Sequence, residues 1–279
     1  MIAFAANSLL CRLALQHTAI DPVGFTTLRL TSGAIVLWGL VWKMKSGDIP
    51  RFPLRRKRGM SPPGNWWSAL ALFGYAAGFS LAYVSLPAAT GALLLFGSVQ
   101  ATMIGYGLWN GERLHLVQLL GLLLAVGGIV GLLLPGLAAP PLISAACMIG
   151  AGVAWGIYSL RGRGAGDPTA VTAGNFLRTV PIALLLAIGM RDGLAFDAAG
   201  IGYAIASGAL ASGIGYAIWY TALPQLRATI AATVQLSVPV IAAIGGILVL
   251  GESLTLRLIL AAIAILSGIA LVILRKPAK

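Results

Sequence analysis

The sequence has few charges and few residues that could act as acids, bases, nucleophiles or metal ligands. Charged residues make up 9% of the 279 residues, against about 25% in soluble domains. The acids and histidines all fall in connections or at the ends of apolar segments: Asp21, Asp48, Glu112, Asp167, Asp192, Asp197, Glu252, His17 and His115. Enzymes need convergent catalytic groups, and metal sites need clustered ligands. The sequence therefore predicts neither an enzyme nor a metal or cofactor site.

Cysteine is also scarce. Cys11 and Cys147 each lie within an apolar segment, so we expect buried, inert thiols rather than a disulfide. Apolar residues begin at Ile2 with no basic leader, and we expect no signal peptide.

Long apolar segments dominate what the sequence does contain. Hydrophobic residues make up 59% of the chain, and the mean hydropathy is +0.94. Ten segments approach the roughly 20 residues that a membrane-spanning helix needs. They are 2–16, 22–42, 65–85, 88–109, 114–134, 142–160, 170–190, 199–221, 227–250 and 254–274. The sequence predicts an all-α polytopic membrane protein with ten transmembrane helices.

The net charge of +12 is concentrated in two places. Basic residues crowd the proline-containing loop 43–64 and the C-terminal tail, next to apolar segments. Clusters of this kind lie on the cytoplasmic side of membranes, so we expect both termini inside (N-in, C-in). A lipid bilayer explains the charge without a nucleic-acid partner.

One pattern of residues occurs twice in the chain. The first copy contains Gly78-Phe79, Tyr83, Leu86-Pro87, Ser98-Val99 and Gly111-Glu112-Arg113-Leu114, and the second contains Gly215-Tyr216, Tyr220, Leu223-Pro224, Ser237-Val238 and Gly251-Glu252-Ser253-Leu254. Arg12 and Arg29 recur, equally spaced, as Arg161 and Arg178. We predict two five-helix repeats, 1–134 and 142–274, joined by the linker 135–141. Because five is odd, the second repeat enters the membrane inverted, a common plan of secondary transporters.

The ten segments, Leu28-Arg29 at the start of the second, and Gly-Glu-x-Leu before the fifth and tenth resemble the EamA-type transporters of the drug/metabolite transporter superfamily. The resemblance covers essentially the whole chain, and is strongest to a bacterial exporter of aromatic amino acids. It implies a location in the bacterial inner membrane and export of small organic solutes. It also implies a central cavity lined by helices 1, 3, 4, 6, 8 and 9. One departure is that the second half has no counterpart of the basic loop.

Aromatic residues recur at helical spacing in both halves. Tyr75, Phe79 and Tyr83 form a stripe on the third segment, and Tyr216, Trp219 and Tyr220 form its counterpart on the eighth. Stripes at matching places in inverted repeats are expected to face one central cavity, which Asn7, Trp155 and Tyr158 would complete. Such a wall suits flat apolar solutes and organic cations. The alternative is that these aromatics pack the core or lie at the membrane interfaces.

Polar residues within the segments add candidates for substrate contact. Gln100 and Gln235 either bind substrate or form interhelical hydrogen bonds. Arg29 and Arg178 either bind a substrate carboxylate or extend to the interface and hold a loop carbonyl. The glutamates of Gly-Glu-x-Leu are expected to satisfy the first turn of the following helix.

Proline in two segments predicts moving parts. Pro181 and Pro239 lie inside segments, where a missing N–H frees a carbonyl and weakens the helix, so we expect hinges there.

Taken together, these features predict a secondary transporter that exports small amphipathic metabolites, most of all amino acids, by alternating access. Proton-coupled transporters carry the proton on an acid or histidine within the membrane. None lies centrally here, so we expect a uniporter. Two alternatives stay open: a proton-coupled drug exporter, if Glu112 or Glu252 lies deeper than its position suggests, and a non-transporting scaffold or receptor.

Overall fold

The computed structural model describes residues 1–46, 64–111, 113–136, 139–162, 167–222 and 234–274, and each predicted segment contains a helix there. The helices are α1 (Ile2–His17), α2 (Pro22–Ser46), α3 (Trp66–Tyr83), α4 (Ala88–Trp109), α5 (Leu116–Leu133), α6 (Leu142–Gly162), α7 (Pro168–Gly189), η1 (Arg191–Gly193), α8 (Ala198–Ala206), η2 (Ser207–Ile214), α9 (Gly215–Ala222), α11 (Ser237–Leu250) and α12 (Leu256–Leu274). The prediction of an all-α chain is confirmed for the described residues, which contain no strand. Most of the basic loop 43–64 lies outside them.

Seven of these helices are long and apolar enough to cross a membrane. They are α2, α4, α5, α6, α7, the continuous run 198–219 and α12. Helix α11 is apolar but shorter, and α1, with 16 residues, is shorter than a full span. A chain of this composition and helix length is a multi-pass membrane protein.

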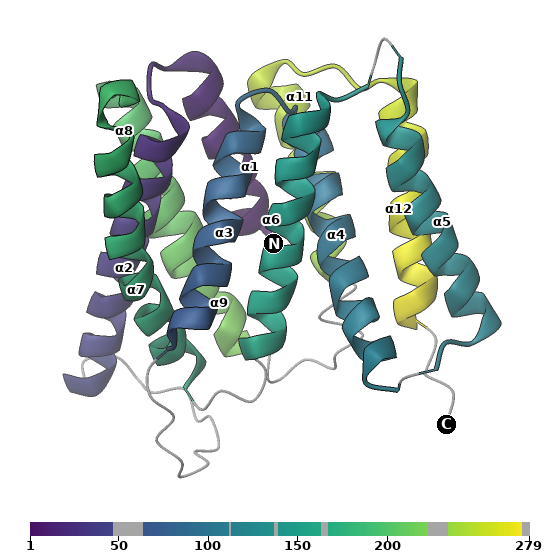
Figure 1. The fold of residues 1–279 in the computed structure, drawn as a ribbon, viewed down its shortest axis with the longest axis horizontal. Helices are drawn as coiled ribbons and strands as arrows, with labels where there is room; N and C mark the ends of the chain where they lie inside the picture. The colour runs from purple at the N-terminus through teal and green to yellow at the C-terminus, as the bar shows by residue number, and fades with distance from the viewer. Residues whose placement is uncertain (47–63, 112, 137–138, 163–166, 223–233, 275–279) are drawn as a thin grey trace.

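The helices stand side by side, with α5 and α12 paired at one end of the long axis (Figure 1). Elsewhere α2 packs on α7 and η2, α3 and α4 pack on α6, and α1 packs on α11 and η2. Close approach of α5 and α12 depends on two glycines, because a Cβ at Gly121 would lie 2.6 Å from the carbonyl oxygen of Gly268.

The repeated Gly-Glu-x-Leu sequence has a backbone explanation. Gly111 and Gly251 both have positive φ, 88° and 65°, a conformation that side chains disfavour and that ends helices. Gly251 is the C-cap of α11, and Gly111 follows Asn110, the C-cap of α4. The glycine therefore stops one helix so that the chain can turn into the next.

Side chains fix several helix starts. Asp167 accepts hydrogen bonds from the N–H groups of Thr169 and Ala170 at the start of α7, and Pro168 occupies the first helical position. At the start of α3 Asn65 accepts from the N–H of Ser68. These local signals explain why the helices begin near the predicted positions.

Candidate functional site

A cluster of buried aromatic rings joins the two halves of the chain. On α3, the Tyr75 and Phe79 rings lie 5.5 Å apart between centroids. The Trp155 ring of α6 lies 4.9 Å from Tyr75 and 5.1 Å from Tyr216 of α9. Tyr158 stacks on Trp155 at 5.4 Å. This connected set, with the two residues described next, is the aromatic cluster.

Two further phenylalanines complete it. The Phe4 ring of α1 contacts Tyr216 at 5.6 Å and Trp219 at 6.0 Å. Phe176 of α7 contacts Tyr216 at 5.8 Å. The aromatic cluster therefore draws rings from α1, α3, α6, α7 and α9, and its edge-on and tilted contacts are those that aromatic pairs favour.

Arg29 of α2 is buried against the aromatic cluster, with 1% of its surface exposed. The guanidinium carbon lies 5.2 Å from the Tyr75 ring centre and 4.9 Å from that of Phe79, within the range of a cation–π contact. Its Nη2 donates to the Tyr75 hydroxyl at 3.0 Å, and its Nε donates to Ser212 Oγ at 3.3 Å. Nη1 has no partner in the part of the chain that the structure describes.

The π-helical segment η2 supplies hydroxyls to this site. Ser207 donates to Asn7 Oδ1 at 2.5 Å, and Asn7 Nδ2 donates to the Tyr75 hydroxyl at 3.3 Å. Hydrogen bonds in a π-helix run between residues five apart rather than four, which is the separation of Ser207 and Ser212. The segment approaches α2 closely because Gly208, which lacks a side chain, lies against the Arg29 carbonyl. Short π-helical turns occur often at functional sites.

Several predicted site residues lie at the edge of the aromatic cluster or outside it. Tyr83 contacts Phe79 at 4.7 Å, but its hydroxyl donates to the Ala88 carbonyl at the start of α4. Arg178 is half-buried and donates to the carbonyl of Gly174 in its own helix at 2.8 Å. Gln235 is half-buried just before α11. The side chain of Tyr220 lies outside the described residues.

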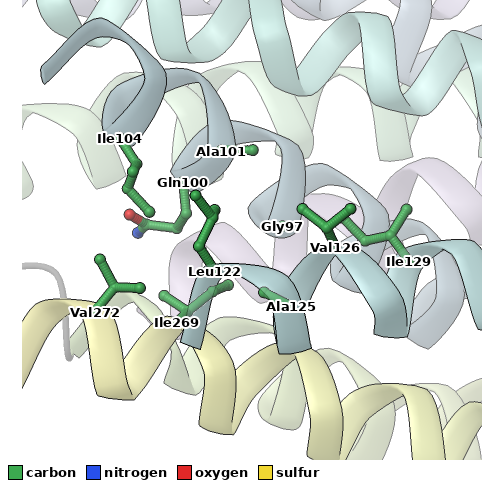
Figure 2. Close-up of a pocket in the computed structure, with 10 residues that line it drawn as sticks. All are labelled: Gly97, Gln100, Ala101, Ile104, Leu122, Ala125, Val126, Ile129, Ile269 and Val272. Atoms are coloured by element: carbon green, nitrogen blue, oxygen red, sulfur yellow. The ribbon is translucent and has the colours of Figure 1, made fainter. Parts of the chain in front are cut away.

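Gln100 lines a small pocket between α4, α5 and α12. The volume of the pocket is about 10 Å³, which is room for about one water molecule. Figure 2 shows the amide among apolar neighbours from the three helices: Gly97, Ala101, Ile104, Leu122, Ala125, Val126, Ile129, Ile269 and Val272. None of these belongs to the aromatic cluster. The structure therefore places Gln100 at a helix interface.

The two prolines differ in position. Pro181 lies inside α7, which continues from Pro168 to Gly189. Pro239 lies in the first turn of α11, directly after a break at Leu236. An N–H at Pro239 would have bonded the carbonyl of Gln235, four residues earlier, so the break falls where the proline removes that bond.

The glutamate of the second Gly-Glu-x-Leu does not serve the helix that follows it, as the sequence suggested. Glu252 instead accepts from the N–H of Ala88 at the start of α4, at 3.0 Å and 2.8 Å for its two oxygens. It also pairs with Arg12 of α1 at 3.4 Å, while Thr255 caps α12 by accepting from the N–H of Leu258. The expectation was wrong because the connection folds back onto α4. Glu112 lies outside the described residues.

Arg12 extends this link to a third helix, α3. Its Nη1 donates to the carbonyls of Tyr83 and Val84 at the end of α3, at 3.0 Å and 2.9 Å. The Arg12–Glu252 link therefore ties α1, the end of α3, the start of α4 and the connection before α12 at one end of the helices.

Sequence reasoning missed Phe4, Phe176, Ser207 and Ser212 of the site, and it missed the link that Arg12 makes at the helix ends. A single aromatic or serine in an apolar segment carries no directional signal, and only the duplication of Arg12 as Arg161 pointed to a role. Within the described residues no group of three or more His, Cys, Asp or Glu side chains could hold a metal ion. What the site offers is a buried cation, neutral hydrogen-bond donors and acceptors, and ring faces.

The chain is similar to transporters over part or most of its length. Residues 142–274 match the EamA-like transporter family. The chain is 56% identical over 273 residues to PA1977, an uncharacterized protein of Pseudomonas aeruginosa, covering 98% of this chain and 91% of that one. It is 29% identical over 269 residues to the threonine/homoserine exporter RhtA of Salmonella typhimurium, covering 92% and 85%.

A solved crystal structure of another protein shares the fold, with a TM-score of 0.64 at 22% identity, covering 97% of this chain and 95% of that one. The narrower resemblance to an exporter of aromatic amino acids stays a prediction.

Proposed function

We propose that this chain exports amino acids, including aromatic ones, from the bacterial cytoplasm across the inner membrane, and the match of residues 142–274 to the EamA-like transporter family supports a role in transport. The single observation that carries the proposal is the aromatic cluster around buried Arg29, since it offers ring faces and a cation to a small amphipathic solute. Similarity to an exporter of threonine and homoserine supports amino acids as the substrate class. Organic cations suit the site less well, because Arg29 already occupies the faces of Tyr75 and Phe79.

The transport mechanism in this proposal is alternating access between two inverted repeats, 1–134 and 142–274, with both termini inside. Helix pairing supports the inverted repeats. In the two repeats α1 corresponds to α6, α3 to the run of α8, η2 and α9, and α4 to α11. The packing of α3 on α6 therefore has its counterpart in the packing of α8 and η2 on α1, and the packing of α4 on α6 has its counterpart in that of α11 on α1. The pairs α2–α7 and α5–α12 are each their own counterpart. The substrate site then lies where the repeats meet.

Energy coupling in this proposal is absent, so the protein works as a uniporter. Among the described residues, the buried polar and charged side chains include arginine, amides and hydroxyls but no Asp, Glu or His. Arginine keeps its proton, so a proton carrier is missing from that set. Glu252 lies in a connection and is already engaged by Arg12 and Ala88.

Transport by purified protein in liposomes tests the proposal. Liposomes loaded with unlabelled phenylalanine, tryptophan, threonine or homoserine are expected to take up the labelled amino acid by exchange, and protein-free liposomes are not. In cells, overproduction is expected to protect against toxic amino-acid analogues. Absence of exchange for the whole panel would favour a non-transporting membrane scaffold.

A further inference from the structure

We infer that Arg29 binds the carboxylate of the transported solute, so that the protein selects amino acids over analogues in which an uncharged group, such as an amide, replaces the carboxylate. The inference rests on the proposed transport function and names the group that the site recognises. Three features of the described residues carry it: the burial of Arg29, the free Nη1, and the absence of a counter-charge.

The hydrogen-bonding capacity of Arg29 is only partly used. Tyr75 and Ser212 take Nη2 and Nε with neutral oxygens, and Nη1 is left buried without a partner among the described residues. Burying an unpaired N–H of a charged group costs more free energy than burying an unpaired N–H of a neutral group, because the hydrogen bonds to water are lost and the protein does not replace them. A group that accepts from Nη1 would remove this cost.

Charge balance makes an anion the fitting partner. The described residues contain two ion pairs, Arg12–Glu252 and Arg191–Asp192, and neither involves Arg29. The ring faces of Tyr75 and Phe79 offset part of the buried charge, but they cannot neutralise it. A carboxylate accepts from a guanidinium with two oxygens in one plane, and it would arrive with the solute.

The surroundings of Arg29 fit the remainder of an amino acid. Trp155 is a largely buried ring beside Tyr75, and it suits an apolar or aromatic side chain. Arg178, the counterpart of Arg29 in the repeated pattern, differs because it is half-buried and donates to Gly174 of its own helix. It therefore serves as a matched control.

The experiment is competition against exchange of labelled phenylalanine and of labelled threonine in liposomes. Unlabelled amino acid is compared with its amide, phenylalaninamide or threoninamide, which keeps the shape but not the carboxylate charge. We expect wild-type protein to prefer the acid by about ten-fold to a hundred-fold, the value of one or two hydrogen bonds to a charged group. Arg29→Gln should abolish this preference by weakening the acid alone, and Arg178→Gln should retain it.

Arg29→Lys keeps the charge but not the fork of donors, so we expect an intermediate preference. Size-exclusion profiles and melting temperatures check that each variant is folded. Equal inhibition by acid and amide in wild-type protein would overturn the inference while leaving transport intact. So would an equal loss of both in folded Arg29→Gln. Absence of any exchange in wild-type protein would instead refute the proposed function, and this inference with it.

Discussion

Replacing Glu252 with glutamine should reduce the free energy of unfolding by about 1.5 to 3 kcal/mol, the usual range for a hydrogen bond to a charged group. The carboxylate is well shielded, because 13% of its side chain and 10% of that of Arg12 are exposed. Breaking a fully buried pair costs about 3 to 5 kcal/mol. The lower range applies here because glutamine still offers one oxygen to the Ala88 N–H, and Arg12 keeps the carbonyls of Tyr83 and Val84.

The measurement is reversible unfolding of the purified protein in mixed micelles by SDS titration, followed by circular dichroism. The chain contains its own control in Arg191–Asp192, an ion pair 3.6 Å long with side chains 80% and 97% exposed. Exposed pairs contribute little, so Asp192→Asn should leave the unfolding curve unchanged within error.

A double-mutant cycle isolates the interaction between the two side chains. If Arg12 and Glu252 act as a pair, Arg12→Gln combined with Glu252→Gln should be less destabilised than the sum of the single variants, by about 1 kcal/mol or more. Strict additivity, or a Glu252→Gln variant as stable as Asp192→Asn, would refute the reasoning from burial.

Three further predictions concern transport. Phe79→Ala and Tyr216→Ala should lower exchange per folded molecule about ten-fold or more, whereas Trp109→Ala, at an exposed position, should not. Exchange is expressed per folded molecule because each of the two buried substitutions should reduce the free energy of unfolding by about 3 to 5 kcal/mol. Normal exchange in both variants would contradict the site. Pro181→Ala and Pro239→Ala restore an N–H, and should slow turnover more than they weaken binding; weaker binding with unchanged turnover would argue for a site contact instead of a hinge. An imposed pH gradient should drive no uphill accumulation of a neutral amino acid, and accumulation would exclude a uniporter.

Helix positions could be predicted from the sequence because they depend on local signals. Apolar length sets the spans, and residues such as Asp167 and Gly251 mark their ends. The direction that each side chain faces is a different matter. Helix α4 has no distinct polar face, so nothing in its sequence pattern showed that Gln100 would lie against α5 and α12.

The aromatic stripe on α3 illustrates the same limit. Residues four apart overshoot a helical turn of 3.6 residues by about 40°, so Tyr83 lies about 80° round the helix from Tyr75. Tyr75 consequently reaches Arg29, whereas the Tyr83 hydroxyl reaches the start of α4. The link from Glu252 to Ala88 joins positions 164 residues apart, and no local pattern encodes a contact at that separation.

The π-helical segment η2 also sets the rotation of everything that follows it in the span. A π-helical bulge contains one residue more than the α-helical turn that it replaces. Because an α-helix turns by about 100° per residue, changing η2 to α-helix by one residue would rotate Tyr216 and Trp219 by about 100° relative to Ser207. Ser207 and the rings of Tyr216 and Trp219 belong to one continuous helical run, 198–219, and their relative orientation depends on the eight residues Ser207–Ile214. A small change in the helical winding of η2 would therefore rotate the Tyr216 ring away from Trp155. The hydroxyl of Ser207, which donates to Asn7, would stay in place.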